Sequence, residues 1–238
     1  MTKRTLNQNA KYVQELIDLV EPDFKFFNKP RNRLKAVNND LNSNLFKIDQ
    51  LSKLKKDIDS IDDCNLKNKS KDLILGDGDI NSPIMFIGEA PGEIEEKSGL
   101  TFQGDHGALL NKMLNAINLY RDKVYIAYTI NFRPPNDRKP TSNEIKRYST
   151  FLKDHISIID PKVIILMGAT ATQAVTNFYG KISDERGKWK EIILKNKTYP
   201  LMITFNPSYL IRFPENKKFS WEDLKKIKKK IQELNIKI

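Results

Sequence analysis

Four short apolar segments constrain the fold of this chain more than any other feature. They occupy residues 84–87, 124–130, 163–167 and 201–205 and are rich in Ile, Val and aromatic side chains. Each is too short for a buried helix and is followed by Gly or Asn, so each is predicted to be a buried strand that ends in a polar loop. Helical patterns separate the four segments, which favours right-handed β-α-β connections and a mostly parallel sheet.

We therefore expect an α/β fold, a three-layer sandwich whose central four-stranded, mostly parallel sheet lies between helices. Apolar residues at helical spacing predict covering helices at about residues 109–117, 169–178 and 220–234. A further helix is predicted to begin at Thr141 or Ser142, because Glu144 can complete a capping box with Thr141.

Residues 1–75 differ from the rest of the chain in being rich in Lys, Asn and Asp, with Leu, Ile and Tyr at helical spacing. We expect two helices there, joined by the segment at residues 26–30, with solvated charged faces and apolar faces that pack. The predicted organisation is a helical N-terminal extension at residues 1–75 and an α/β domain with a basic C-terminal helix at residues 76–238.

The net charge of the chain favours a polyanionic partner. The formal charge is +11 and the sequence pI is about 9.5, and Lys and Arg side chains that neutralise phosphates release counterions. From Asn216 to the end there are 8 Lys and 3 acidic residues. This run is either a solvated helix face or a surface that contacts phosphates. Codons rich in A and T encode Lys, Asn and Ile, and these three residues are abundant together here. Mutational bias is therefore an alternative source of part of the positive charge.

The cysteine content limits the metal chemistry that the chain can support. Cys64 is the single cysteine, which excludes an internal disulfide and cannot by itself hold zinc or an iron–sulfur cluster. The chain also has no apolar run of about 18 residues and no signal-peptide pattern. We therefore expect an intracellular protein.

Polar residues follow three of the predicted strands, namely Glu89, Asn131 and Asn206. Because the carboxyl ends of parallel strands meet at one edge of a sheet, we expect these side chains to converge where α/β proteins bind ligands. The first of these loops contains four glutamates, Glu89, Glu93, Glu95 and Glu96. Mutual repulsion is expected to raise the pKa of at least one of them, which suits proton transfer or water activation. The alternative is an acidic, solvated turn.

Several segments in a fixed order carry a resemblance to a known family. They are residues 88–96, 99–104 with 107–110, 131–135, 186–189 and 206–212. The first begins Gly-Glu-Ala-Pro-Gly and the last begins Asn-Pro-Ser. The ordered set resembles family 4 uracil-DNA glycosylases over about residues 75–213. That resemblance implies a parallel sheet between helices, and an enzyme that flips uracil out of the duplex and hydrolyses its N-glycosidic bond.

The resemblance also implies roles for individual residues. Phe102 would stack on the flipped base, and Asn131 would pair with O4 and N3–H of uracil while presenting the wrong pattern to cytosine. The other implied base contacts are Ala90 and Ser208, and the implied DNA contacts are Tyr209, Leu210, Arg212, Arg186 and Lys188. Taken singly, Phe102 is better explained by core packing, and Asn131 is explained equally well by capping of a turn.

The implied catalytic residues include one departure from the family. Glu89, with Glu95 or Glu96 as support, would position water or stabilise an oxocarbenium-like sugar, and which carboxylate acts is open. Asn206 stands where the family usually has His, whose imidazole lies near uracil O2. Loss of a well-placed transition-state donor lowers the rate by about 10²–10³. Asn still offers a neutral donor, as in the related mismatch-specific glycosylases, so we expect activity that is reduced but not abolished. The two histidines of the chain, His106 and His155, are expected to be structural or surface residues.

A second departure concerns metal. The family usually holds a [4Fe–4S] cluster on four cysteines, one pair before the first strand and two flanking the Arg-Pro-Pro segment. Here Cys64 would be a remnant of the first pair, while Phe132 and Tyr148 stand at the later positions. One thiolate cannot replace four. We therefore expect no metal or other cofactor, and apolar packing around Phe132 and Tyr148 in the place of the cluster.

We therefore expect a cytoplasmic, nucleoid-associated, monomeric DNA repair glycosylase that acts on uracil in DNA, with no membrane partner. The alternative is a catalytically weakened or silent DNA- or uracil-binding protein of the same fold, because Phe102, Asn131 and the basic surface would serve both. An unrelated nucleotide-binding sheet protein is disfavoured, since no strand is followed by a Walker lysine loop or by Gly-x-Gly-x-x-Gly.

Overall fold

The computed structural model describes residues 33–61, 66–70 and 72–236, and it describes side chains from Ser43 onward, Lys69 excepted. The chain divides into two compact units, Met1–Asn42 and Ser43–Ile238. The sheet, its covering helices and the candidate site all belong to the second unit. The predicted first helix, with Tyr12, Leu16 and Leu19, lies outside the described residues, as does Cys64.

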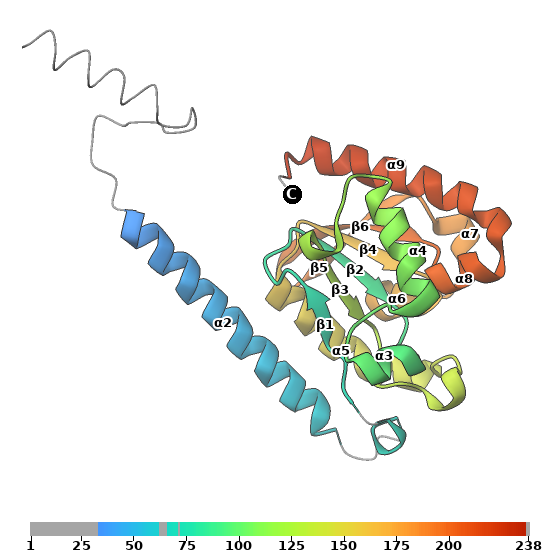
Figure 1. Cartoon of the computed structure of the whole chain (residues 1–238), viewed down its shortest axis with the longest axis horizontal. Coiled ribbons are helices and arrows are strands. Elements are labelled where there is room, and N and C mark those ends of the chain that lie inside the picture. Colours follow the sequence, from blue (N-terminus) through green and yellow to red (C-terminus); the bar gives the residue numbers. More distant parts are fainter. Residues whose placement is uncertain (1–32, 62–65, 71, 237–238) are drawn as a thin grey trace, which may run out of the picture. The chain divides into compact units, whose positions relative to one another are not determined.

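The second unit is built on a mixed sheet of six strands in the order β1-β3-β2-β4-β6-β5 (Figure 1). The strands are β1 (Gly76–Gly78), β2 (Ile84–Gly88), β3 (Tyr125–Tyr128), β4 (Val163–Met167), β5 (Trp189–Leu194) and β6 (Lys197–Thr204). The inner four are parallel, as predicted, and their apolar segments are almost entirely buried.

The two outer strands, β1 and β5, were not predicted, and both pair antiparallel with their neighbours. β1 has only three residues. β5 is polar and partly exposed, and it joins β6 through Lys195 and Asn196, which have φ values of 45° and 65°. Two consecutive residues with positive φ are typical of a type I′ hairpin turn. The expected four-stranded sheet is therefore extended by an edge strand on each side.

Helices cover both faces of the sheet, which gives the predicted three layers (Figure 1). α4 (Gly104–Asn115), α8 (Pro207–Arg212) and α9 (Lys217–Glu233) pack on one face with β-strand residues such as Phe86 and Ile165. α5 (Ser142–Ile159) and α6 (Ala169–Thr176) pack on the other face with residues such as Met85 and Ile164. The shorter helices are α3 (Glu93–Ser98) and α7 (Ile182–Glu185), with 3₁₀ turns at η1 (Lys67–Lys69), η2 (Arg121–Lys123), η3 (Pro135–Asp137) and η4 (Pro214–Asn216).

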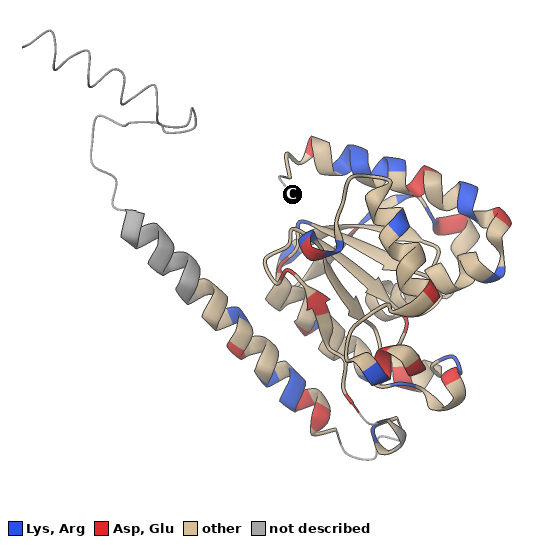
Figure 2. Cartoon of the chain, in the orientation of Figure 1, with Lys and Arg blue, Asp and Glu red and all other residues tan. Residues whose placement is uncertain are grey.

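The helix boundaries follow the local sequence signals closely. Thr141 caps α5, since its side chain accepts a hydrogen bond from the Glu144 backbone while the Glu144 carboxylate accepts one from Thr141 N–H. α9 begins at Lys217, three residues before the predicted start at Ser220, because η4 leads directly into it. Figure 2 shows basic residues along α9. Lys225 pairs with Glu222 at 2.8 Å and Lys230 with Glu233 at 3.6 Å, so part of the run is neutralised within the helix.

A third apolar cluster joins α2 (Arg33–Asp59) to the sheet domain. Leu54 and Ile58 of α2 are buried against Ile130, Phe132 and Tyr148. The end of α2 thus shares its core with residues of the predicted α/β domain, and the boundary expected between residues 75 and 76 stays a prediction. Within the described part of the chain, no helix is both long enough and apolar enough to cross a membrane.

Candidate active site

The candidate site lies where the chain changes direction across the sheet. From β2 the chain continues to β3 on one side of the sheet, whereas from β4 it continues to β5 and then β6 on the other side. Open α/β sheets bind ligands at such a switch point, outside the carboxyl ends of the strands. Glu89, directly after β2, accepts a hydrogen bond of 2.5 Å from the Thr170 hydroxyl at the start of α6. This contact bridges the switch point between β2 and β4.

The other three glutamates of the loop are held by the protein itself. The buried Glu95 carboxylate accepts hydrogen bonds from Gly92 N–H at 3.0 Å and Gln103 N–H at 2.8 Å, which fixes the start of α3. Glu96 and Glu93 pair with Arg133 at 3.2 Å and 3.5 Å. The expected loop is therefore a short capped helix whose carboxylates have structural partners.

At Glu93 the pKa shift runs opposite to the one expected from repulsion between carboxylates. The pKa of Glu93 lies below its ordinary value, because Lys97 donates a hydrogen bond of 2.6 Å to it and Arg133 lies nearby. Repulsion between carboxylates is outweighed at this position by neighbouring cations. Glu89 accepts its hydrogen bond from the Thr170 hydroxyl at the strand ends, whereas Glu96 accepts one from the Ser70 hydroxyl at 2.7 Å in addition to its pair with Arg133.

Asn131 is buried three residues beyond the end of β3. Its Nδ2 donates a hydrogen bond of 3.0 Å to Ile74 O, and Ile74 N–H donates back to Asn131 O at 2.9 Å. Ile130 N–H donates to Glu89 O at 3.0 Å, so the Asn131 segment runs beside the Glu89 backbone. An Asn amide has two N–H donors, and the bond to Ile74 uses one of them.

Phe102 covers the end of β2. Its side chain is 4% exposed, and its backbone N–H donates to the Tyr128 hydroxyl at 2.8 Å. A Cβ atom at Gly88 would lie 2.5 Å from Phe102 Cζ, so only glycine leaves room for the ring against the strand end. Phe102 has a φ of 44°, a conformation that costs a non-glycine residue energy. Phe102 is therefore packed against the end of β2, and the base-stacking role that the resemblance implies for it stays a prediction.

Asn206 caps helix α8. Its Oδ1 accepts hydrogen bonds from the backbone N–H and the hydroxyl of Ser208, both at 3.1 Å, and its Nδ2 makes a long contact of 3.4 Å with Met167 O. A Cβ atom at Gly168, whose φ is 92°, would lie 3.1 Å from Asn206 Cβ. Asn206 therefore lies against the end of β4, and its amide nitrogen is the less firmly held end of the side chain.

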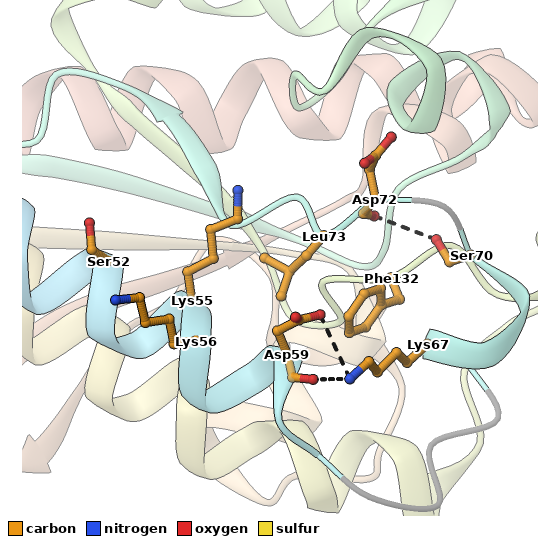
Figure 3. A pocket seen from close by; sticks show the side chains of 9 residues that line it. All are labelled: Ser52, Lys55, Lys56, Asp59, Lys67, Ser70, Asp72, Leu73 and Phe132. Atoms are coloured by element: carbon orange, nitrogen blue, oxygen red, sulfur yellow. Dashed lines mark hydrogen bonds and ion pairs between the residues drawn. The ribbon is translucent and has the colours of Figure 1, made fainter.

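The structure also describes surfaces that sequence patterns did not indicate. A cavity of about 580 Å³ lies between the end of α2 and the segments at residues 67–70 and 72–73, and Figure 3 shows the side chains that line it. The residues that line it are Ser52, Lys55, Lys56, Asp59, Lys67, Ser70, Asp72, Leu73 and Phe132. Neither Glu89 nor Asn206 lines this cavity, so it is not the strand-end site. Thr170 was also missed, although it directly follows the Gly-Ala pair after a predicted strand.

Comparison with known proteins places these features in a family. The model of the Uracil DNA glycosylase superfamily matches residues 75–227, well over half of the chain. The chain belongs to the uracil-DNA glycosylase superfamily. It is 36% identical over 189 residues to a protein of Sulfurisphaera tokodaii named "Type-4 uracil-DNA glycosylase", covering 76% of this chain and 84% of that one. It is 37% identical over 170 residues to a protein of that name from Thermotoga maritima, covering 69% and 86% of the two chains.

Within this uracil-DNA glycosylase fold, the residues implied as DNA contacts have different environments. Tyr209 is 37% exposed, and Arg212 and Lys188 are also exposed. Leu210 is 1% exposed and packs in the core, and the DNA contact implied for it stays a prediction. Ala90 is partly buried and packs beside the third apolar cluster.

Arg186, the fifth implied DNA contact, is engaged within the protein. It pairs with the fully buried Asp223 and donates to Phe219 O. Burial raises the pKa of the Asp223 carboxyl, and Arg186 and the Thr204 hydroxyl, which donates at 2.8 Å, act against that increase. Removing one partner of such a buried pair leaves an uncompensated charge. Arg186 therefore has a structural role in holding α9 against β6.

The two histidines are placed as expected for residues outside the motif. His106 is exposed on α4, and His155 is buried with its Nε2 2.9 Å from the Tyr125 hydroxyl. Burial lowers the pKa of His155 to about 3, so its imidazole is neutral in the folded protein.

Phe132 and Tyr148, which stand where the resemblance implies cluster ligands, do not fit a [4Fe–4S] cluster. Phe132 is 2% exposed and Tyr148 is fully buried, and both pack among aliphatic side chains from α2 and the end of β3. Such clusters need thiolate ligands, and these two positions supply apolar rings. Within the described ranges, no group of three or more His, Cys, Asp or Glu residues could hold a metal ion.

Proposed function

We propose that this chain hydrolyses the N-glycosidic bond of uracil in DNA. One observation carries the proposal: Glu89, Asn131, Phe102 and Asn206 line the carboxyl ends of neighbouring parallel strands at the switch point. The similarity to proteins named Type-4 uracil-DNA glycosylase supports it independently. An enzyme that reaches the glycosidic bond has to take the nucleotide out of the base stack, so the proposal includes base flipping.

Recognition of the base is assigned to Phe102 and Asn131. The Phe102 ring supplies a flat face for stacking, while the Asn131 amide offers a donor for O4 and an acceptor for N3–H. The amino group of cytosine would meet the amide nitrogen, and a buried mismatch of this kind costs about 1–3 kcal/mol. The bond from Asn131 Nδ2 to Ile74 O supports this role, because it fixes the amide orientation and leaves its second N–H for a ligand.

The chemical step is assigned to Glu89 and Asn206. As the bond between C1′ and N1 breaks, positive charge develops on the sugar and negative charge on the base. Glu89 would orient the attacking water and stabilise the cationic sugar, while the Asn206 amide nitrogen would donate towards O2. The hydroxyl of the water then bonds to C1′, and the proton released from that water neutralises the departing uracil anion.

The proposal is tested by incubating the protein with an oligonucleotide containing one uracil, followed by alkaline cleavage. Cleavage at the uracil position by the parent protein, together with its loss in Glu89→Gln, is the expected result. The same strand with cytosine at that position is the control and is expected to stay intact. Binding without cleavage in every variant would favour a silent DNA-binding protein, which the commitment of Asn206 Oδ1 to capping supports as the second candidate.

Two further properties belong to this proposal. We infer that the enzyme works without an iron–sulfur cluster, because apolar packing around Phe132 and Tyr148 occupies the corresponding positions. We also infer that it acts as a monomer on DNA in the cytoplasm, since all four assigned residues come from one chain.

A further inference from the structure

We propose that an aromatic row formed by α8 and the residues that flank it is a stacking platform for unpaired bases of single-stranded DNA. The row consists of Phe205, Tyr209 and Phe213. The inference rests on the proposed function for the identity of the polymer, and it adds the form of DNA that the enzyme engages beside the flipped nucleotide.

The row leads from the candidate site to the surface. Phe205, which directly precedes Asn206, is 6% exposed, while Tyr209 and Phe213 are 37% and 40% exposed. The Phe205 and Tyr209 rings are stacked with centroids 4.9 Å apart and planes at 25°. The Tyr209 and Phe213 rings follow at 4.9 Å and 41°. Ring contacts thus extend continuously from the residue before Asn206 to a partly exposed aromatic side chain.

Charge around the row suits a polyanion. Arg212, Lys217 and Lys218 are exposed and lie within five residues of Phe213 in the chain, as does the exposed Glu215. Lys218 Nζ lies 5.0 Å from the ring centroid of Phe219, itself 41% exposed. The acidic Glu222 is paired with Lys225 at 2.8 Å. Exposed rings interleaved with cations are the combination that binds single strands, because bases stack on rings while phosphates contact Lys and Arg.

The exposed groups favour unpaired bases over an intact duplex. A protein that kinks duplex DNA inserts an apolar wedge between base pairs, and Leu210 is buried in the core. Ile211 is 40% exposed and is the aliphatic side chain on α8 that could act as a wedge. The partly exposed rings of Tyr209 and Phe213 instead suit bases that are not held in base pairs. The row therefore predicts that Tyr209 and Phe213 contribute to single-strand binding and Ile211 does not.

The test measures binding of the full chain to a fluorescent, uracil-free oligothymidylate by anisotropy. Tyr209→Leu and Phe213→Leu, which keep apolar volume but remove the ring, are each expected to weaken binding about tenfold. Tyr209→Phe keeps the ring and is expected to bind as the parent does. Ile211→Ala and Tyr179→Ala are matched controls, since Ile211 is aliphatic on the same helix and Tyr179 is an exposed ring elsewhere. Both controls are expected to change single-strand affinity less than twofold.

Parental affinity in both leucine variants would overturn the proposal, as would an equal loss in Ile211→Ala. A loss of affinity for uracil-free duplex as large as that for the single strand would also overturn it. Thermal unfolding of each variant separates loss of stacking from loss of fold, and Tyr209→Phe keeps the test valid if the leucine variants are unstable. Excision is measured separately, so a protein that binds single strands through Tyr209 but cleaves no uracil would refute the proposed function and leave this inference standing.

Discussion

Glu89 and Thr170, separated by 81 positions in the chain, are joined by a hydrogen bond of 2.5 Å across the ends of β2 and β4. This bond fixes one carboxylate at the switch point while its neighbours Glu93, Glu95 and Glu96 bind Arg133 or backbone N–H groups. The structure thereby gives different hydrogen-bond and ion-pair partners to four chemically identical glutamates that lie within residues 89–96.

Glu89→Gln is expected to lower uracil excision by about 10² or more, because a neutral amide cannot stabilise developing positive charge or accept a proton from water. Thr170→Val, which removes only the hydroxyl that orients Glu89, is expected to lower it less. The readout is the single-turnover excision rate, with Glu93→Gln as the control at an exposed glutamate of the same segment. If Glu93→Gln slowed the reaction as much as Glu89→Gln, the assignment of the acting carboxylate would be wrong.

Substitutions at Asn206 separate its capping role from its donor role. Asn206→Asp keeps an oxygen that can accept from Ser208 N–H but removes the amide donor. We expect near-parental thermal stability and an excision rate lowered by about 10²–10³. Asn206→Ala removes both groups, so it is expected to lose about 1 kcal/mol of stability in addition to the loss of rate. Asn206→His supplies a new donor and is expected to retain activity. An Asn206→Asp variant with the parental rate would show that the amide takes no part in the reaction.

Phe132→Ala is expected to destabilise the folded protein by about 3–5 kcal/mol, since it opens a cavity in the third apolar cluster. Denaturant titration measures this change. Phe46→Ala provides the control, because Phe46 lies on α2 but is 63% exposed, and it is expected to change stability by less than about 0.5 kcal/mol. Equal effects of the two substitutions would argue that α2 does not pack on the domain through this cluster.

Iron content tests the cofactor inference directly. We expect purified protein to be colourless and to contain no stoichiometric iron, because Phe132 and Tyr148 offer no thiolate. Reconstitution with iron and sulfide under reducing conditions should leave the thermal unfolding temperature unchanged. Incorporation of about four irons per chain, the stoichiometry of a cubane cluster, would contradict the inference.

His155 is expected to make stability fall on mild acidification. Its pKa is lowered to about 3 in the folded state from an ordinary value of 6.5. Between these two pH values the unfolded chain binds a proton that the folded protein excludes, so the free energy of unfolding decreases as the pH falls below about 6.5. Between neutral pH and about pH 5 the loss is about 2 kcal/mol from this group. Denaturant titrations of the parent and His155→Gln at both pH values measure it, and the variant should show the smaller decrease.

Local patterns in the sequence determined the four inner strands, the capped start of α5 and the order of the motifs. Apolar runs bounded by Gly or Asn specify buried strands because the pattern of burial is set within a few residues. The positions of Glu89, Asn131 and Asn206 at strand ends then follow from parallel topology. The edge strand β5 escaped prediction because its polar, partly exposed residues lack a core-facing pattern, and its place depends on pairing with β6.

Only the tertiary structure decided which partners these residues have and which of them are buried. Arg133 and Gln103 select the partners of Glu93, Glu95 and Glu96, and those contacts arise from segments that are brought together by folding. Packing likewise buries Leu210 and pairs Arg186 with Asp223, whereas Tyr209 next to Leu210 is left exposed. Residue type sets what a side chain can donate, accept or bury, but its partner is fixed by long-range packing, because hydrogen bonds and desolvation depend on groups distant in the sequence.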